Sequence, residues 1–258
     1  MNAQELFSLR GRVALVTGGS RGLGRMIAMG FLQQGAKVYI SSRKKDACDQ
    51  AAIELSAYGE CISLPADLST TEGVKGLAAS LSQREPELHV LVNNAGAAWE
   101  ATFDDFPELG WDKVLNLDLK APFFLTHALA ALLRRAAQKG RPSKVINIAS
   151  IDGVSINPRE SYSYSGAKAG LVHLTRHMAQ RLIKDHIVVS AVSPGEFPSD
   201  MNRDARDKPD LTAARIPAGR LGEPEDLAAA AIYLASRAGD YLVGSNIVVD
   251  GGVSWSRA

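Results

Sequence analysis

The chain has 258 residues, 46% of them hydrophobic, and its 29 lysines and arginines almost balance its 28 aspartates and glutamates. A formal net charge of +1 gives no sign of a basic surface for nucleic acid, and no apolar run approaches the ~18 residues of a membrane span. The two cysteines form no CxxC pair and the first residues lack the segments of a signal peptide, so we expect a cytoplasmic protein with neither a nucleic-acid nor a membrane partner.

Short runs rich in β-branched residues alternate with stretches of helical periodicity. The predicted strands are Val13–Thr17, Lys37–Ser41, Cys61–Leu64, Val90–Asn93, Lys144–Ala149, Ile187–Val192 and Asn246–Asp250. The predicted helices are Gly24–Gln34, Asp46–Tyr58, Thr70–Gln83, Asp112–Lys139, Ser165–Asp185 and Pro224–Ser236. Strands that are apolar on both faces and alternate with helices are typical of parallel sheets with right-handed crossovers. The sequence therefore predicts an α/β fold, a Rossmann-type doubly wound parallel sheet of about seven strands with helices on both faces.

The domain organisation follows from the evenness of this pattern. No linker, repeat or low-complexity tract interrupts it, so we expect a single domain over residues 1–258. One segment, residues 196–220, breaks the rhythm because it is rich in proline and charge and follows directly on a strand. Long insertions of this kind are usually lids or binding loops, and ligands of open α/β sheets bind beyond the carboxyl ends of the strands. We expect a substrate lid there.

A glycine-rich turn follows the first predicted strand and opens a helix, the context that a phosphate-binding turn needs. Its spacing is Gly-x-x-x-Gly-x-Gly, which differs from the usual dinucleotide fingerprint. Backbone N–H groups at such a helix start can hold a phosphate, although tight turns also use glycine for conformational reasons alone. The predicted cofactor-binding residues of this turn are Gly18, Ser20, Arg21, Gly22, Leu23 and Gly24.

The end of the second predicted strand indicates which cofactor the turn serves. An NAD site places an acidic residue there to hold the ribose 2′-hydroxyl, whereas NADP requires a positive charge. Here Ser42 and Arg43 follow the strand, and the first acid is Asp46. Arg21 can approach the same 2′-phosphate from the other side. This favours NADP(H), the alternative being that both arginines are merely solvated.

Tyr164 and Lys168 are four residues apart on a predicted helix and therefore lie on one face. An ammonium beside a phenol stabilises the phenolate, so we expect a pKa for Tyr164 closer to working pH, where acid–base catalysis is most effective. An ordinary solvated ion pair is the alternative. His173 and His177 share the same spacing, but no His-Glu-x-x-His pattern is present and we expect no metal site.

Several further blocks carry a family resemblance along almost the whole chain. They are Thr17–Gly24, Ala66-Asp67-Leu68, Asn93-Asn94-Ala95-Gly96, Ser150, Tyr164-x-x-x-Lys168 and Pro194-Gly195. In this order they resemble the short-chain dehydrogenases/reductases. Tyr162-x-Tyr164, the fourteen-residue spacing from Ser150 to Tyr164, and Pro194-Gly195-x-Phe197-Pro198-Ser199-x-Met201 look like the 3-oxoacyl reductases associated with rhamnolipid synthesis.

The resemblance implies a role for each matching residue. Ser150 would bind the carbonyl oxygen of the substrate, Tyr164 would give it a proton, and Lys168 would hold the nicotinamide ribose. Asp67 and Leu68 would hold the adenine. The remaining implied cofactor contacts are Asn93, Ala95, Gly96, Pro194, Gly195, Phe197 and Ser199.

One departure concerns the segment that usually reads Asn-Leu-x-x-x-Phe, in which asparagine supports a water-linked proton relay to the lysine. Matching Leu119 and Phe123 puts Asp118 at that position. The aspartate either accepts from the same water and strengthens the charge on Lys168, or disturbs the relay. We count Asp118 among the candidate catalytic residues.

The sequence thus predicts an NADP(H)-dependent oxidoreductase that reduces a ketone to a secondary alcohol, with a 3-oxoacyl thioester as the favoured substrate. A sugar, polyol or small-alcohol dehydrogenase is one alternative. A catalytically weak NADP(H)-binding sensor is another, although such a sensor would need only the cofactor half of the site. Segments 219–225 and 250–252 resemble those that build homotetramers in relatives, so we expect a homotetramer or a dimer.

Overall fold

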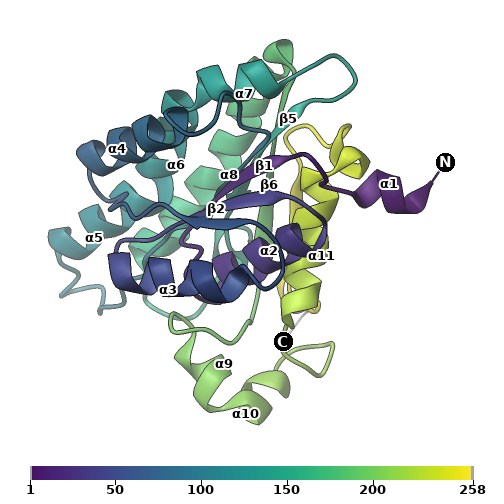
Figure 1. Cartoon of the computed structure of the whole chain (residues 1–258). Coiled ribbons are helices and arrows are strands. Elements are labelled where there is room, and N and C mark those ends of the chain that lie inside the picture. The colour runs from purple at the N-terminus through teal and green to yellow at the C-terminus, as the bar shows by residue number, and fades with distance from the viewer. Residues whose placement is uncertain (1, 257–258) are drawn as a thin grey trace.

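A computed structural model describes residues 2–256, which form one sheet of seven strands with every neighbouring pair parallel (Figure 1). The strands are β1 (Val13–Thr17), β2 (Lys37–Ser41), β3 (Cys61–Ser63), β4 (Val90–Asn93), β5 (Ser143–Ile148), β6 (Ile187–Pro194) and β7 (Asn246–Val249). Their order across the sheet is β3-β2-β1-β4-β5-β6-β7. The predicted fold class is confirmed.

Helices cover both faces of the sheet. The longer ones are α2 (Gly22–Gln33), α3 (Lys45–Leu55), α4 (Thr71–Ser82), α5 (Glu108–Leu115), α6 (Ala121–Ala128), α7 (Ala130–Ala136), α8 (Tyr162–Leu182) and α11 (Pro224–Ala235). Three helices of five residues, α1 (Ala3–Phe7), α9 (Arg203–Asp207) and α10 (Pro209–Ala213), were not predicted. None of the described helices is both long enough and apolar enough to cross a bilayer.

Two hydrophobic cores result from the alternation of side chains along the strands. In β1, Ala14 and Val16 pack with α2, α3 and α11 on one face. Leu15, between them, packs with α4, α6, α7 and α8 on the other face. Burial on both faces explains why the strand sequences read as unbroken apolar runs.

The predicted helix over Asp112–Lys139 is wrong in its continuity. The chain begins to coil at Glu108, forms a π-helical turn, η1, at Asn116–Lys120, and is broken again at Leu129 between α6 and α7. Pro122 has no N–H to donate to the carbonyl of residue 118, so the regular bonding pattern is lost where the π turn lies. Asp118 lies in this irregular turn, and its side chain is buried.

The segment 196–220 is folded rather than structureless. Its helices α9 and α10 lie together at the lower edge of the view in Figure 1, away from the sheet. The segment leaves the carboxyl end of β6 and returns to α11, so it lies on the side of the sheet where the predicted site residues are found.

Candidate active site

The predicted site residues gather at the carboxyl ends of the central strands. Strand β1 pairs with β2 on one side and β4 on the other, so successive connections diverge to opposite sides of β1. In open α/β sheets the crevice at such a switch point is the usual ligand site. The glycine turn follows β1, the Ala95-Gly96 turn follows β4, Ser150 follows β5, and Pro194-Gly195 ends β6.

The glycine turn leaves the start of α2 open to a ligand. Gly18 has φ +66°, a left-handed conformation that favours glycine. A side chain at Gly24 would lie 2.8 Å from the carbonyl carbon of Gly18 and closer still to its oxygen. The turn and the helix can therefore approach each other this closely only because residue 24 is a glycine. At Arg21, the residue before α2, no side chain caps the helix. The free N–H groups of the first turn fit an anion such as a pyrophosphate.

Asn94, which was not among the predicted site residues, ties this turn to the end of β4. Its Nδ2 donates to the carbonyl of Thr17 at 2.7 Å, and its backbone N–H donates to Thr17 Oγ1 at 2.9 Å. The N–H of Ala95 donates to the same hydroxyl oxygen at 2.9 Å. The amide side chain within the Asn-Asn-Ala-Gly block was the available signal, because a carboxamide can bind two backbone segments at once.

Ser150, Tyr164 and Lys168 come together as predicted. The Ser150 and Tyr164 side chains line one cleft. Lys168 Nζ lies 5.4 Å from the centre of the Tyr164 ring and donates to the carbonyl of Ile148 at 2.9 Å. Gly153, also missed by the sequence analysis, permits this arrangement, because a side chain there would lie 2.7 Å from the Lys168 backbone.

The expectation of a lowered pKa for Tyr164 is wrong for the free protein. Burial raises the pKa of Tyr164 above its ordinary value of 10.0, and the neighbouring Lys168 and Ser150 do not offset it. Burial would lower the pKa of Lys168, but Asp118 and Tyr164 outweigh it and hold that pKa above its ordinary value. The site therefore holds a protonated phenol beside a charged ammonium.

Asp118 contacts Lys168 directly. Its Oδ2 lies 3.1 Å from Lys168 Nζ, and its Oδ1 accepts the backbone N–H of Ala97 at 2.8 Å. The side chain is fully buried, and burial raises the pKa of Asp118 although Lys168 and Ala97 act in the opposite sense. This contact favours the first of the two sequence-based expectations, in which Asp118 strengthens the charge on Lys168.

The predicted cofactor residues after β2 and β3 lie near one another. Arg43 is exposed, and its charge acts on Asp67. Burial alone would raise the pKa of Asp67, but two hydrogen bonds from Ser69 and the charge of Arg43 hold it below its ordinary value. Ser42, which directly precedes Arg43, is half-buried, with its hydroxyl 3.4 Å from the Lys44 carbonyl oxygen.

Arg21 has a partner that the sequence did not suggest. Its guanidinium forms an exposed ion pair with Asp200, from the segment 196–220, and Asp200 also pairs with Arg206 at 2.7 Å. Ser199 of the same segment lies beside Gly22, 3.6 Å from where a side chain on that glycine would begin. The beginning of the predicted lid thus rests on the glycine turn.

Two predicted cofactor residues turn their side chains inward. Asn93 is buried, and its Nδ2 donates to Asn147 Oδ1 at 2.8 Å and to Thr126 Oγ1 at 3.2 Å. Leu68 is buried in the core with α4 and α6. Buried polar groups need internal partners, and the side chain of Asn93 finds one across the sheet. It therefore links β4 to β5 and does not point toward the cleft.

The cleft beside Tyr164 has a mixed polar and apolar lining. Of the predicted residues it brings together Leu23, Ser150, Tyr164, Pro194, Gly195, Phe197 and Ser199. Its other charged or amide-bearing residues are Glu100, Asp152, Asn157, Arg159, Glu196 and Asn202. Arg159 pairs with Asp204 of α9 at 2.9 Å, which links the cleft wall to the lid segment.

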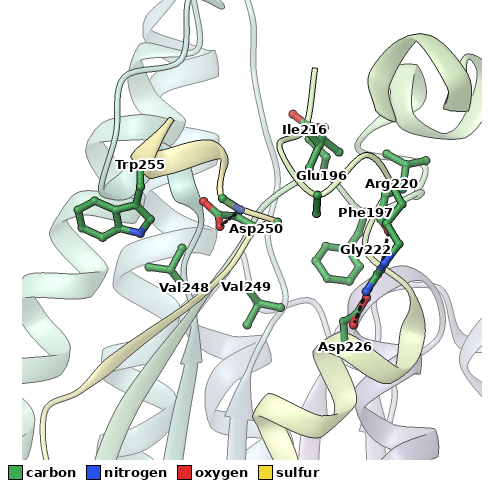
Figure 2. A pocket seen from close by; sticks show the side chains of 14 residues that line it. Glu196, Phe197, Ile216, Arg220, Gly222, Asp226, Val248, Val249, Asp250 and Trp255 are labelled. Carbon is green, nitrogen blue, oxygen red and sulfur yellow. Dashed lines mark hydrogen bonds and ion pairs between the residues drawn. The ribbon is translucent and has the colours of Figure 1, made fainter. Parts of the chain in front are cut away.

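A second cavity, of about 500 Å³, lies beyond Phe197 (Figure 2). Phe197 and Glu196 belong to its wall and to the wall of the catalytic cleft. Figure 2 shows the Arg220–Asp226 ion pair on one side and Trp255 on the opposite side. Gly222 packs on the Phe197 ring, so this aromatic side chain is fixed between the two spaces.

Comparison with known proteins matches this geometry. The family model described as enoyl-(acyl carrier protein) reductase matches residues 18–254. The rhamnolipids biosynthesis 3-oxoacyl-[acyl-carrier-protein] reductase of Pseudomonas aeruginosa is 46% identical over 95% of this chain and 97% of its own. The chain belongs to the short-chain dehydrogenase/reductase family. The predicted family and the predicted oxidoreductase class are confirmed.

A solved structure and a second relative broaden the comparison. The structure of the Pseudomonas aeruginosa RhlG/NADP active-site complex superposes with a TM-score of 0.94 at 45% identity, covering 98% of this chain and 100% of that one. The 2-dehydro-3-deoxy-D-gluconate 5-dehydrogenase of Escherichia coli is 36% identical over 95% of this chain and 96% of its own. Relatives with similar sequences in this family are thus named for different substrates.

Proposed function

We propose that this protein is an NADP(H)-dependent oxidoreductase that reduces a ketone to a secondary alcohol. The observation that carries the proposal is the placement of Ser150 and Tyr164 in one cleft, with the Lys168 ammonium 5.4 Å from the centre of the Tyr164 ring. Two hydroxyl groups on one side of a cleft can bind a carbonyl oxygen and stabilise the charge that it gains. When bound, NADPH supplies the hydride.

The protein's own groups then have separate tasks. Tyr164 gives its proton to the carbonyl oxygen, and its raised pKa keeps that proton available at neutral pH. Ser150 holds the oxygen in place. Lys168, fixed by the Ile148 carbonyl at 2.9 Å, holds the ribose hydroxyls of the cofactor beside Tyr164.

The cofactor fits the turn between β1 and α2, whose first N–H groups carry no side-chain cap. Ser42 and Arg43 are proposed to bind the 2′-phosphate, since a positive charge stands where NAD-dependent proteins place an acid. Asp67 is proposed to bind the adenine, and the glycine turn with Ala95 and Gly96 to cradle the pyrophosphate and ribose. The solved relative with 45% identity is an NADP complex, which supports this choice.

For the substrate we propose a 3-oxoacyl thioester, in line with the name of the 46% identical relative. A hydroxylated substrate, such as a sugar acid, is the second candidate, because three carboxylates, Glu100, Asp152 and Glu196, line the cleft. Burial raises the pKa of Asp152. A carboxylate near the reacting carbonyl accepts hydrogen bonds from hydroxyl groups, whereas an alkyl chain would desolvate it without compensation.

We also propose that residues 1–258 act as one domain and that residues 196–220 are the lid over the bound substrate. Ion pairs join that segment to both sides of the site, through Arg21–Asp200 and Arg159–Asp204. A cytoplasmic homotetramer is the proposed assembly. The edge strand β7 is only half-buried and Trp255 is 80% exposed, which leaves apolar surface for subunit contacts.

The test is oxidation of NADPH followed at 340 nm with acetoacetyl thioesters, ketoses and keto sugar acids, repeated with NADH. Turnover with a strong preference for NADPH supports the proposed reaction, and the better substrate identifies the class. Tight NADPH binding without turnover of any carbonyl compound would instead make the protein a nucleotide-binding sensor and refute the proposal.

A further inference from the structure

A buried carboxylate stands directly behind the catalytic lysine. Asp118 lies in the π turn η1, and its side chain is fully buried. A side chain on Gly96 would lie 2.8 Å from Asp118 Oδ2, so the backbone of the Ala95-Gly96 turn closes over the carboxylate. π turns within longer helices are often found at functional sites.

The ammonium of Lys168 lies between this carboxylate and the phenol. Its Nζ is 3.1 Å from Asp118 Oδ2 and 5.4 Å from the centre of the Tyr164 ring. The side chain of Lys168 is 5% exposed, so little solvent screens these charges from one another. The charge state of each of the three groups therefore depends on the other two.

We propose that Asp118 is a positioning residue that opposes the electric field of Lys168 at Tyr164 and so helps to keep Tyr164 a proton donor. The inference rests on the proposed function. An isolated ammonium beside Tyr164 would favour the phenolate. A carboxylate paired with that ammonium offsets part of this effect, since its charge acts on the phenol in the opposite sense.

The charges that face Tyr164 from the packed elements agree with this balance. Lys168, on the same helix, lowers the pKa of Tyr164, while Asp118 from η1 and Asp152, just after Ser150, raise it. Ser150 also acts in the lowering sense. Burial is the largest cause that holds the pKa of Tyr164 above its ordinary value, and the two carboxylates act in the same sense.

The raised pKa of Tyr164 should affect the two directions of the reaction differently. Reduction of a ketone needs the phenol, whereas oxidation of an alcohol needs the phenolate as base. We expect reduction to remain active through neutral and mildly alkaline pH, and oxidation to become active only at higher pH. The overall equilibrium is unchanged, because the protein acts only on the rates.

Replacing Asp118 by asparagine removes the negative charge and keeps the shape. Asp118 Oδ2 lies within about 8.5 Å of the Tyr164 ring centre, because the two measured distances meet at Lys168 Nζ. At that separation a unit charge shifts a pKa inside a protein by about one unit. In D118N the pH profile of kcat/KM for alcohol oxidation should move about one unit toward acid.

The matched control is Asp112→Asn, which removes the same charge from the exposed surface of α5 and should leave the profile unchanged. A second measurement uses the wild-type protein. Phenolate absorbance near 295 nm, taken as the difference between wild type and Tyr164→Phe, should show no ionisation of Tyr164 below about pH 9.

The outcomes separate this inference from the proposed function. An unshifted profile in D118N, or a Tyr164 phenolate that forms near pH 7 in the wild type, overturns the inference while leaving the reductase intact. Full turnover by Tyr164→Phe overturns the proposed function itself. A one-unit acid shift in D118N, absent from Asp112→Asn, supports the role of Asp118.

Discussion

The packing at the glycine turn predicts the effect of adding one methyl group. In Gly24→Ala, the new Cβ would lie 2.8 Å from the Gly18 carbonyl carbon and closer to its oxygen and to Asn94 Nδ2. Neither partner can retreat easily. The Gly18 oxygen is backbone in a turn with positive φ, and Asn94 Nδ2 is bonded to the Thr17 carbonyl at 2.7 Å.

The expected cost combines two effects. Overpacking at a tight site costs about 1–3 kcal/mol, and replacing glycine inside a helix returns about 0.5–1 kcal/mol. We expect a net loss of about 1–2 kcal/mol, which lowers Tm by roughly 2–8 °C in a chain of this size. Displacing the turn also misaligns the N–H groups proposed to hold the pyrophosphate. Losing one such charge-assisted bond, worth about 1.5–3 kcal/mol, weakens NADPH binding at least about tenfold.

Gly76→Ala is the matched control. Gly76 lies inside α4, and a side chain there would meet nothing within 4 Å. We expect this substitution to raise Tm slightly and to leave NADPH binding unchanged. Thermal unfolding and fluorescence titration with NADPH measure both variants. If Gly24→Ala matched Gly76→Ala in both measurements, the close contact between turn and helix would not exist as described.

Two further substitutions test other parts of the account. Arg43→Ala should raise the KM for NADPH about 10–100-fold without changing that for NADH, because a charge-assisted bond to the 2′-phosphate is lost. Lys44→Ala, a neighbouring exposed cation, is its control, and equal effects of the two would exclude Arg43 as the phosphate ligand. Asp240→Asn should cost about 3 kcal/mol in urea unfolding, since it leaves the buried Lys144 Nζ, now 2.7 Å from Asp240 Oδ1, unpaired. A loss below about 1 kcal/mol would mean that Lys144 reaches solvent or another partner.

The sheet was predictable because its strands are buried on both faces. Six of the seven predicted strands differ from the observed ones by at most one residue at either end, and β1, β2 and β4 agree at both ends. The interruption of the helix around Asp118 was not predictable. Apolar periodicity continues through it, and the missing N–H of Pro122 removes only a single hydrogen bond. The short helices α9 and α10 also escaped prediction, since five residues are too few to show a period.

The candidate site was foreseen from its spacing more than from its contacts. Tyr164 and Lys168 share a helix face, so their proximity follows from local geometry. The ion pairs of Asp118 with Lys168 and of Arg21 with Asp200 join positions 50 or more residues apart, which no local pattern encodes. The raised pKa of Tyr164 was missed for the same reason, because burial is a property of the assembled fold.

The central claim is that Tyr164 supplies the proton while the cofactor binds independently of it. The most direct measurement compares wild type with Tyr164→Phe for turnover of the carbonyl substrate and for NADPH binding. We expect turnover to fall by about 10²–10⁴-fold, as for the loss of a general acid, with the NADPH dissociation constant almost unchanged. Turnover within tenfold of wild type, with NADPH bound equally well, would contradict the account.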